Sequence, residues 1–446
     1  MSNKLPFLIT EDPEQPIAYR LGRAVLAREL VGDVYAIAQL LPEQTFLLNA
    51  CRDRYHFVVG MGAALLRGQV CVLPHNHSAD TVSMLRDRFG DLLCLIDDDN
   101  PFEGLSSLTF PHKLTGSSQW PPPEFDADQL AACLFTSGST GKPARFDRTW
   151  GAIADSARAA AAGLGLRPQD QWRVLATVPS QHSYGFESAI FLPLLTNGLF
   201  DAGQPFYPAD VVAALGQLDR PRLLVTTPVH LRSIVESTGA KVEADMILSA
   251  TAPLSHSLAQ AAETFFSAPV FEIYGSTESG QTATRRTVDG DLWTPMDGVR
   301  IVQDEDRFFA RCHVGERVEL SDNLGLEADG RFRLLGRKAD MVIVAGKRGS
   351  KAFLEAQLCA IDGIHDAAIL ISEDGGESAR VVGFVIAPGH TRRTVIQALK
   401  RSVEPAFLPR PLYFVDRLPR ESTGKLSRQA LQALTIELDA KVGHTQ

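Results

Sequence analysis

Short apolar runs alternate with helical stretches along most of this 446-residue chain, and no other feature constrains its fold as strongly. The runs Phe46–Ala50 and Val70–Leu73 flank a helical stretch at Phe57–Leu66. The alternation resumes after a Pro-rich loop at 116–128. Its later strands are predicted at Arg173–Val178, Arg222–Thr226, Met246–Ala250 and Val270–Tyr274, and its later helices at Ala209–Leu218, Pro228–Glu236 and Ser257–Phe266. This pattern predicts a layered, largely parallel α/β body.

The texture of the sequence changes after about Gly298. Short alternating segments at Val299–Val302, Glu316–Leu320 and Arg331–Leu335 predict a small antiparallel sheet. Beyond Arg337, strands at Met341–Ala345, Ala367–Ile371 and Val381–Ile386 and helices at Phe353–Ala360 and Thr394–Val403 predict an independent α+β domain. We therefore expect a large N-terminal multi-layer α/β domain (1–337) with a small β subdomain, and a small C-terminal α+β domain (338–446).

Composition excludes several classes of protein. A net charge of −9 disfavours a general nucleic-acid binder, although residues 338–446 carry 15 Lys or Arg against 12 Asp or Glu. No apolar run approaches the length of a membrane span, and the N-terminus lacks a secretory signal pattern. Six cysteines are scattered without a C-x-x-C pair, as reduced core thiols are. We expect a cytoplasmic enzyme.

The loop Leu134–Pro143 (LFTSGSTGKP) has the composition of a phosphate cradle. Gly138 and Gly141 allow close approach of the backbone, and the apolar run Leu130–Phe135 and the Ala-rich helix Trp150–Leu164 flank the loop. It is not a Walker A loop, because Thr136 and Pro143 occupy positions where that motif needs Gly and Ser or Thr. Taken alone, a Gly/Ser/Thr loop of this kind is more often a solvated turn than a nucleotide site.

A second polar segment, Phe271–Glu278 (FEIYGSTE), ends a predicted strand with an aromatic, a glycine, hydroxyls and a carboxylate. Such a strand end can stack a flat base and place an anion beside a metal, but it is also compatible with a plain polar turn. The pair His75 and His77 has no further ligand nearby, so we expect a loop there rather than a metal site.

Four motifs together resemble one family. They are Thr136–Pro143, Tyr274–Glu278, Ser321-Asp322 with Gly336-Arg337, and Pro419–Arg428 (PRESTGKLSR). Their order and spacing are similar to those of the adenylate-forming superfamily of acyl-CoA synthetases, aryl-acid ligases and peptide-synthetase adenylation domains. The resemblance spans nearly the whole chain, and the chain looks like a compact stand-alone member of this superfamily.

The resemblance implies a mobile C-terminal lid over the N-terminal domain and a reaction in two halves. An acid first attacks the α-phosphorus of ATP to give an acyl or aryl adenylate and pyrophosphate, with Mg2+ as cofactor. A thiol of coenzyme A or of a carrier protein's phosphopantetheine then takes the acyl group and releases AMP. The acid is expected to be aromatic or a short to medium acyl carboxylate, and an acyl carrier protein is a candidate partner.

The resemblance also assigns residues to these roles. The β- and γ-phosphates are expected to lie on Thr136, Ser137, Gly138, Ser139, Thr140, Gly141 and Lys142. Glu278 and Thr140 would hold Mg2+, with Gly275, Ser276 and Thr277 beside the nucleotide. Tyr274 would stack on adenine, Asp322 would accept both ribose hydroxyls, and Arg337 would fix the ribose or α-phosphate side.

Three further assignments concern the acid and the lid. Lys425 is expected to neutralise the attacking carboxylate and the α-phosphate in the first half-reaction. His182, in Pro179–Gly185, is either a gate between acid pocket and thiol tunnel or a hydrogen-bonded rim residue. The turn Ser249–Leu254, which includes Ala252, resembles the acid-pocket turn of the family.

The chain departs from the family pattern in ways that leave alternatives open. Ala144-Arg145 stands where many relatives carry Lys-Gly. Either Lys142 or Arg145 replaces the missing positive charge, or the loop carries less positive charge than in those relatives. Ala339 replaces a polar hinge residue, and the N-terminal part is shorter than usual. Ala250 and Thr251 replace small glycines, which favours a short or flat acid. The alternatives are a catalytically impaired ATP- or acyl-binding regulatory protein on the same fold and an adenylating oxygenase of the luciferase type.

Overall fold

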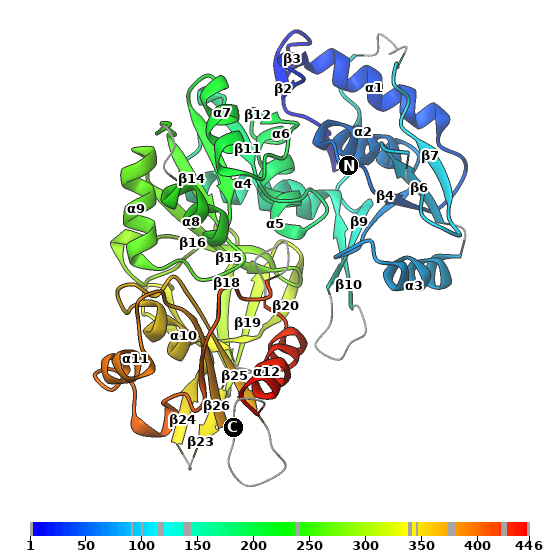
Figure 1. Cartoon of the computed structure of the whole chain (residues 1–446). Coiled ribbons are helices and arrows are strands. Elements are labelled where there is room, and N and C mark those ends of the chain that lie inside the picture. Colours follow the sequence, from blue (N-terminus) through cyan, green and yellow to red (C-terminus); the bar gives the residue numbers. More distant parts are fainter. Residues whose placement is uncertain are drawn as a thin grey trace.

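The computed structural model describes residues 3–90, 92–99, 101–114, 120–136, 144–237, 241–337, 341–344, 347–372, 380–420 and 426–443. Its elements form an N-terminal group around a first sheet, a second group around a larger sheet, a set of short β-hairpins, and a C-terminal group that contains α10 to α12 (Figure 1). Each helix among these residues is too short or too polar to cross a bilayer.

The first sheet has six strands and carries the predicted phosphate loop on its edge hairpin. Its strands, in spatial order, are β10 (Ala144–Thr149), β9 (Leu130–Thr136), β5 (Val70–Leu73), β4 (Phe46–Asn49), β6 (Leu92–Ile96) and β7 (Ser106–Thr109). All neighbours run parallel except β9 and β10. Its helices are α1 (Ala27–Leu40), α2 (Arg54–Leu66) and α3 (Ala79–Phe89). Because β4, β5, β6 and β9 are buried on both faces, their sequences are nearly continuous apolar runs, whereas the edge strand β7 is polar and mostly exposed.

The second sheet has nine strands and supplies most of the candidate site. In spatial order they are β17 (Thr294–Pro295), β16 (Gly280–Arg286), β15 (Val270–Ser276), β14 (Met246–Ser249), β13 (Arg222–Thr226), β11 (Arg173–Ala176), β12 (Leu199–Asp201), β2 (Pro16–Arg20) and β3 (Arg23–Leu26). The six strands from β15 to β2 are parallel, and antiparallel strands close both edges. Helices α7 (Pro208–Gln217), α8 (Pro228–Glu236) and α9 (His256–Phe266) accompany it.

Two helical segments remain: the first connects the two sheets along the chain, and the second lies between β11 and β12 of the larger sheet. Helix α4 (Trp150–Leu164) begins where the Thr149 side chain accepts a hydrogen bond from the Ala152 amide, and it ends at Gly165, which has a φ of +69°. A second segment, here called the gate helix, consists of α5 (Ser183–Gly185), a π-helical turn at Phe186–Phe191 and α6 (Leu192–Leu194). Single π-turns of this kind often occur at functional sites.

The remaining strands form small sheets. An N-terminal pair is β1 (Lys4–Pro6) with β8 (Glu124–Asp126), and three strands follow the large sheet as β18 (Arg300–Asp304), β19 (Arg307–Cys312) and β20 (Gly315–Leu320). Two hairpins are β21 (Asp322–Leu326) with β22 (Phe332–Arg337) and β23 (Met341–Val344) with β24 (Lys347–Ser350). This antiparallel set confirms the predicted β texture after Gly298.

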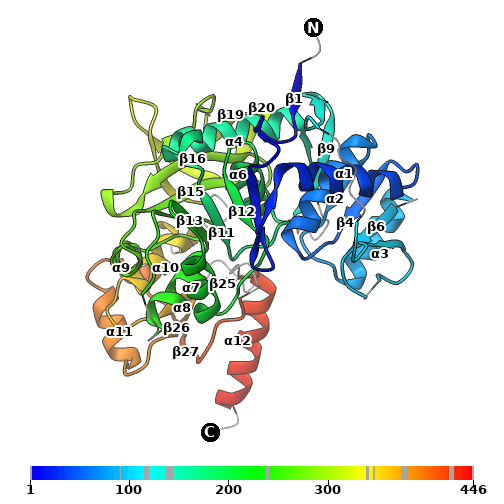
Figure 2. The ribbon, with the colours of Figure 1, turned by 90° about the horizontal axis from the view of Figure 1, so that it is seen from above.

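The C-terminal group has its own apolar core. Its sheet consists of β25 (Asp366–Ser372), β26 (Arg380–Ile386) and β27 (Leu412–Phe414), and its helices are α10 (Lys351–Cys359), α11 (Arg392–Leu399) and α12 (Arg428–Gly443). Seen from above, α12 and the other C-terminal elements lie on the far side of the nine-stranded sheet from β1 (Figure 2). The proposed boundary between residues 337 and 338 stays a prediction, because residues 338–340 lie outside the described ranges.

One prediction about the phosphate loop is wrong. We expected the loop to connect a strand directly to the helix Trp150–Leu164, whereas it connects two antiparallel strands, with Ala144 opposite Thr136. The polar sequence of β10 (ARFDRT) concealed this strand, which is possible because β10 is an edge strand paired on one side only. The helix itself begins and ends at the predicted residues.

Candidate active site

The turn between β15 and β16 holds the second predicted motif. A side chain at Gly275 would place its Cβ 2.1 Å from the Gly280 carbonyl oxygen, so only glycine fits there. The Ser276 hydroxyl accepts hydrogen bonds from the amides of Glu278 (3.2 Å) and Ser279 (3.3 Å). The turn is therefore fixed by its own hydroxyls and presents Thr277 and Glu278 at the end of the strand.

Glu278 has the surroundings of a ligand-binding carboxylate. Its side chain is half-buried, and among the described residues its carboxylate has no hydrogen bond and no ion pair. It lines an open cavity of about 700 Å³, and arginines dominate the charge of that lining. We call this the open cavity, and its lining residues are Arg88, Arg145, Phe146, Asp147, Arg148, Glu278, Val314, Arg317 and Val318. An unpaired carboxylate beside such a cavity fits a hard cation that bridges to phosphate oxygens.

The predicted nucleoside-binding residues come together from distant parts of the chain. The Tyr274 hydroxyl donates a hydrogen bond of 2.9 Å to the Asp322 carboxylate, although the two residues are 48 positions apart. Asp322 is paired with Arg337 across the β21–β22 hairpin. The Tyr274 ring packs edge-on against Phe332 and tilted against Trp293, with centroid distances of 5.5 and 5.7 Å. This packing holds the tyrosine ring in place for a flat partner.

The structure describes the phosphate loop only at its two ends, Thr136 and Ala144. Thr136 ends β9 and is half-buried, and Ala144 begins β10 opposite it. The predicted phosphate residues Ser137, Gly138, Ser139, Thr140, Gly141 and Lys142 lie outside the described residues, as does Lys425. Arg145 lies at the open cavity, where its guanidinium is paired with Asp147 at 2.6 Å and sits over the rings of Phe46 and Phe89.

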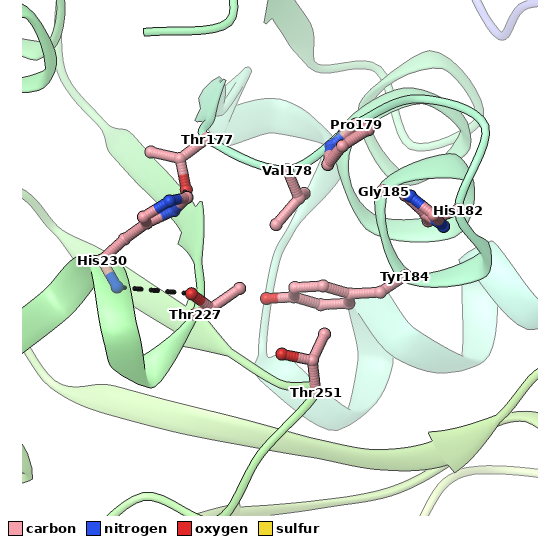
Figure 3. A pocket seen from close by; sticks show the side chains of 9 residues that line it. All are labelled: Thr177, Val178, Pro179, His182, Tyr184, Gly185, Thr227, His230 and Thr251. Atoms are coloured by element: carbon pink, nitrogen blue, oxygen red, sulfur yellow. Dashed lines mark hydrogen bonds between the residues drawn. The ribbon is translucent and has the colours of Figure 1, made fainter. Parts of the chain in front are cut away.

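A second cavity is much smaller and more enclosed than the first. We call it the enclosed cavity; its volume is about 20 Å³, and its lining residues are Thr177, Val178, Pro179, His182, Tyr184, Gly185, Thr227, His230 and Thr251. Figure 3 shows the Tyr184 side chain extending from the gate helix across this space toward Thr227, with Thr251 on one side and Val178 on the other. The Tyr184 hydroxyl donates a hydrogen bond of 2.9 Å to the Leu248 carbonyl oxygen. A volume of this size admits about one water molecule.

The walls of the enclosed cavity are fixed by hydrogen bonds. The His230 ring, through Nδ1, bonds the Thr177 hydroxyl at 2.7 Å, and that hydroxyl bonds the Thr226 hydroxyl at 2.9 Å. Burial lowers the pKa of His230 and raises that of Tyr184, so both side chains are held neutral. The turn that holds Ala252 is anchored by Glu272, whose carboxylate accepts from the Leu254 amide at 3.1 Å and from the Arg285 Nε at 2.7 Å.

His182 is the residue before the gate helix and lines the enclosed cavity. A Cβ on the nearby Gly185 would lie 2.0 Å from the Pro179 carbonyl oxygen, so glycine is required for the helix to turn this closely against the preceding loop. The position of His182 at the edge of this cavity is compatible with both predicted roles, a gate between the acid pocket and the thiol tunnel and a hydrogen-bonded residue at the rim. Both therefore stay predictions.

Sequence reasoning missed several residues around these cavities. His230 and Thr177 were not singled out, because a threonine at a strand end and a histidine in a helix carry no pattern of their own. Arg54 was missed as well: it is 1% exposed, and its guanidinium donates to the carbonyls of Val178 and Gly203 at 3.1 and 2.6 Å. His75 and His77 lie in a loop as predicted, and Cys51, Cys71, Cys94 and Cys133 are buried thiols.

A family model described as AMP-binding enzyme matches residues 41–316, which is more than half of the chain. A second model, the AMP-binding enzyme C-terminal domain, matches residues 354–425. The chain belongs to this family of AMP-binding enzymes. The resemblance seen in the four motifs is thereby confirmed, as is the α/β fold with a large N-terminal and a small C-terminal domain.

Individual relatives of this AMP-binding enzyme are ligases. The 2-succinylbenzoate–CoA ligase of Bacillus pumilus is 25% identical over 349 residues, which cover 70% of each chain. The 4-coumarate–CoA ligase of Cereibacter sphaeroides is 28% identical over 303 residues, which cover 66% of this chain and 69% of the relative. The o-succinylbenzoate coenzyme A synthetase of Bacillus subtilis, solved with ATP and a magnesium ion, shares the fold with a TM-score of 0.82 at 20% identity, and the match covers 96% of this chain and all of that structure. The predicted activity class, ATP-dependent acid–thiol ligation through an adenylate, is confirmed at the level of the family.

Proposed function

We propose that this enzyme activates an aromatic or short to medium acyl acid as its adenylate and then transfers the acyl group to the thiol of coenzyme A or of a carrier protein. The observation that carries the proposal is the hydrogen bond between Tyr274 and Asp322, with Arg337 opposite Asp322 in the hairpin. Three residues that the proposed chemistry needs around one nucleoside thus come from three strands. Relatives named as ligases of 2-succinylbenzoate, 4-coumarate and 4-chlorobenzoate support the aromatic class.

In the first half-reaction a carboxylate oxygen of the acid attacks the α-phosphorus of ATP. A new bond forms between them, the bond from the α-phosphorus to the bridging oxygen breaks, and pyrophosphate leaves. Asp322 accepts hydrogen bonds from the ribose hydroxyls, and the Tyr274 ring lies against adenine. Two residues that already contact each other therefore orient the nucleoside without further rearrangement.

Glu278 is the described residue best placed to hold Mg2+, and Thr140 is proposed as its companion. A bound magnesium ion would offset the negative charge on the phosphate oxygens during the attack. The half-buried Glu278 carboxylate has no competing partner among the described side chains, so it can bind the ion without first losing a hydrogen bond. The phosphate-loop hydroxyls and Lys142 are proposed to contact the β- and γ-phosphates.

The acid is proposed to enter the enclosed cavity between the gate helix and the turn that includes Thr251 and Ala252. Because the cavity now admits about one water molecule, the Tyr184 side chain must move for an acid to bind. The apolar walls favour a flat or short acid, in keeping with Thr251 in place of glycine. In the second half-reaction the thiol sulfur attacks the acyl carbonyl carbon and AMP leaves. His182 is proposed to lie where the thiol enters the site.

The two half-reactions can be tested separately through Lys425. We expect Lys425→Ala to abolish adenylation, since two anions would then approach without a neutralising cation, and to preserve most thioester formation from supplied acyl adenylate. The measurements are acid-dependent ATP–pyrophosphate exchange and thioester formation by mass spectrometry. Lys400→Ala, which removes an exposed lysine at the end of α11, is the matched control. Equal losses in both half-reactions would contradict the role of Lys425.

The acceptor can be identified by competition. The enzyme is incubated with ATP, an active acid, and equal concentrations of coenzyme A and phosphopantetheinylated carrier protein, and the thioesters are counted by mass spectrometry. Thioester on either acceptor supports ligation. Tight ATP binding without pyrophosphate release, with every acid tried, would instead indicate a regulatory protein that kept the fold and lost turnover.

A further inference from the structure

A buried arginine lies on β10, and no step of the proposed reaction uses it. Arg148 is only 3% exposed. Its Nη1 donates a hydrogen bond of 3.0 Å to the Asp147 carbonyl, and its Nη2 donates a short one to the Thr277 carbonyl; its Nε has no partner among the described residues. Burying a guanidinium is costly unless other groups compensate for the lost water. The burial of Arg148 therefore requires groups that compensate for its lost hydration.

Burial lowers the pKa of Arg148, and among the nearby carboxylates the charge of Glu187, on the gate helix, opposes that shift most. Glu187 is 6% exposed and accepts hydrogen bonds from the Ser183 hydroxyl at 2.8 Å, the Gln281 amide at 3.1 Å and the Ser156 hydroxyl at 3.4 Å. Burial raises the pKa of Glu187, and Arg148 opposes that rise through its charge. Without Arg148 the Glu187 carboxylate would be an uncompensated charge inside the protein.

This buried pair connects the three parts of the candidate site. Arg148 lies on the strand that continues from the phosphate loop. The carbonyl that it holds belongs to Thr277, the residue directly before Glu278. Glu187 lies on the gate helix, one turn after His182 and the start of the enclosed cavity. A planar guanidinium that donates from Nη1 to the Asp147 carbonyl and from Nη2 to the Thr277 carbonyl is suited to hold the second carbonyl at a set distance and angle.

We propose that Arg148 is a positioning residue for adenylation: it holds the Thr277 carbonyl so that the Glu278 carboxylate faces the nucleotide, and Glu187 keeps its charge in place. This inference rests on the proposed function of Glu278 as the magnesium-binding carboxylate. A positioning role differs from a purely structural role in what a substitution changes. If Arg148 positions Glu278, its loss weakens the magnesium-dependent part of ATP binding and slows the first half-reaction more than the second.

The test compares two substitutions at this position. Arg148→Met removes the charge and the donors but keeps an unbranched side chain, whereas Arg148→Lys keeps the charge and loses the planar pair of donors. We expect Arg148→Met to lower the maximal rate of pyrophosphate exchange about 10-fold or more and thioester formation from supplied adenylate less than about 3-fold, with partial recovery in Arg148→Lys. Arg158→Met, an exposed arginine on α4, is the control.

ATP binding measured by calorimetry with and without magnesium supplies a readout that needs no turnover. In Arg148→Met we expect weaker binding of ATP in the presence of magnesium and unchanged binding in its absence. If the wild-type protein exchanges no pyrophosphate with any acid, the proposed function fails, and this binding difference still decides the role of Arg148. Equal binding by wild type and a folded Arg148→Met variant, in both conditions, would overturn the inference.

A double variant, Arg148→Met with Glu187→Gln, separates a loss of stability from a loss of positioning. Arg148→Met alone leaves the Glu187 charge buried and unpaired, so the melting temperature should fall; adding Glu187→Gln should restore part of it, because the uncompensated charge is gone. The double variant should regain stability and not the exchange rate. Recovery of both together would show that Arg148 acts only through stability, which contradicts a positioning role.

Discussion

The two cavities of this enzyme differ in volume, charge and enclosure. The open cavity is about 700 Å³ and is lined by four arginines and by Glu278, whose carboxylate has no ion pair among the described residues. The enclosed cavity is about 20 Å³, and the Tyr184 side chain crosses it. Polyphosphates are strongly hydrated and need charged groups that are already in place, whereas an apolar acid needs a dry space of the right shape. Under the proposed assignment, the cavity for the nucleotide is formed in advance, whereas the cavity for the acid must open.

Among the residues that the structure describes, the largest effect should come from removing the carboxylate of the Tyr274–Asp322 pair. Under the proposed role of Asp322, Asp322→Ala would deprive two ribose hydroxyls of a charged acceptor, and we expect pyrophosphate exchange to fall about 100-fold or more. Tyr274→Phe removes only the hydrogen bond between the pair, so its loss should be about 5-fold. Similar losses in the two variants would mean that Asp322 acts by holding Tyr274 rather than by binding ribose.

Neutralising the carboxylate at the open cavity should have the next largest effect. Glu278→Gln preserves the size of the side chain and removes its charge, so the exchange rate should fall roughly 10- to 100-fold. The magnesium concentration that gives half-maximal rate should rise. A magnesium titration of wild type and variant measures both, with Glu236→Gln at the end of α8 as the control. An unchanged magnesium dependence would remove Glu278 from the metal site.

Enlarging the enclosed cavity should change the choice of acid more than the rate. Tyr184→Ala removes the ring that crosses the cavity, and we expect relative kcat/KM to shift about 10-fold toward acids larger than the best wild-type substrate. Tyr184→Phe keeps the ring and loses only the bond to the Leu248 carbonyl, so its preference should stay near that of wild type. If both variants keep the wild-type preference, the acid does not bind at this cavity.

The smallest effect concerns the neutral histidine in the cavity wall. Burial holds the pKa of folded His230 below the 6.5 of an ordinary histidine, so the unfolded chain takes up the proton first. The resulting stability is complete above pH 6.5 and is lost as pH falls through the lower folded pKa. Between pH 7.5 and 5.5 the wild-type melting temperature should drop about 2 °C more than that of His230→Gln. His256→Gln, on the exposed start of α9, should behave as wild type.

Local patterns in the sequence were sufficient for most of the framework. The buried parallel strands are continuous apolar runs, and β13 and α8 begin and end at the predicted residues. Helix α4 was recognisable because its alanines are good helix formers and Thr149 provides an N-cap. The edge strand β10 was missed because it buries few side chains and carries three charges, which resemble a loop.

The parts of the site that escaped prediction depend on contacts far apart in the sequence. Arg148 bonds a carbonyl 129 residues away, and nothing in its neighbours distinguishes it from an exposed arginine of a charged strand. The bond between Tyr274 and Asp322 spans 48 residues and was not predicted; the family resemblance indicated only that both residues serve one nucleoside. Distant partners of this kind have no local period or spacing, so a single sequence cannot reveal them.

The most direct test of the account is acid-dependent ATP–pyrophosphate exchange over a graded series of acids, from acetate and benzoate to long-chain fatty acids, for wild type and Tyr184→Ala. The account predicts that wild type exchanges with flat aromatic or short acids and not with long chains, and that Tyr184→Ala extends the series toward larger acids. No exchange by wild type with any acid, while ATP with magnesium still binds, would contradict acid activation by this enzyme.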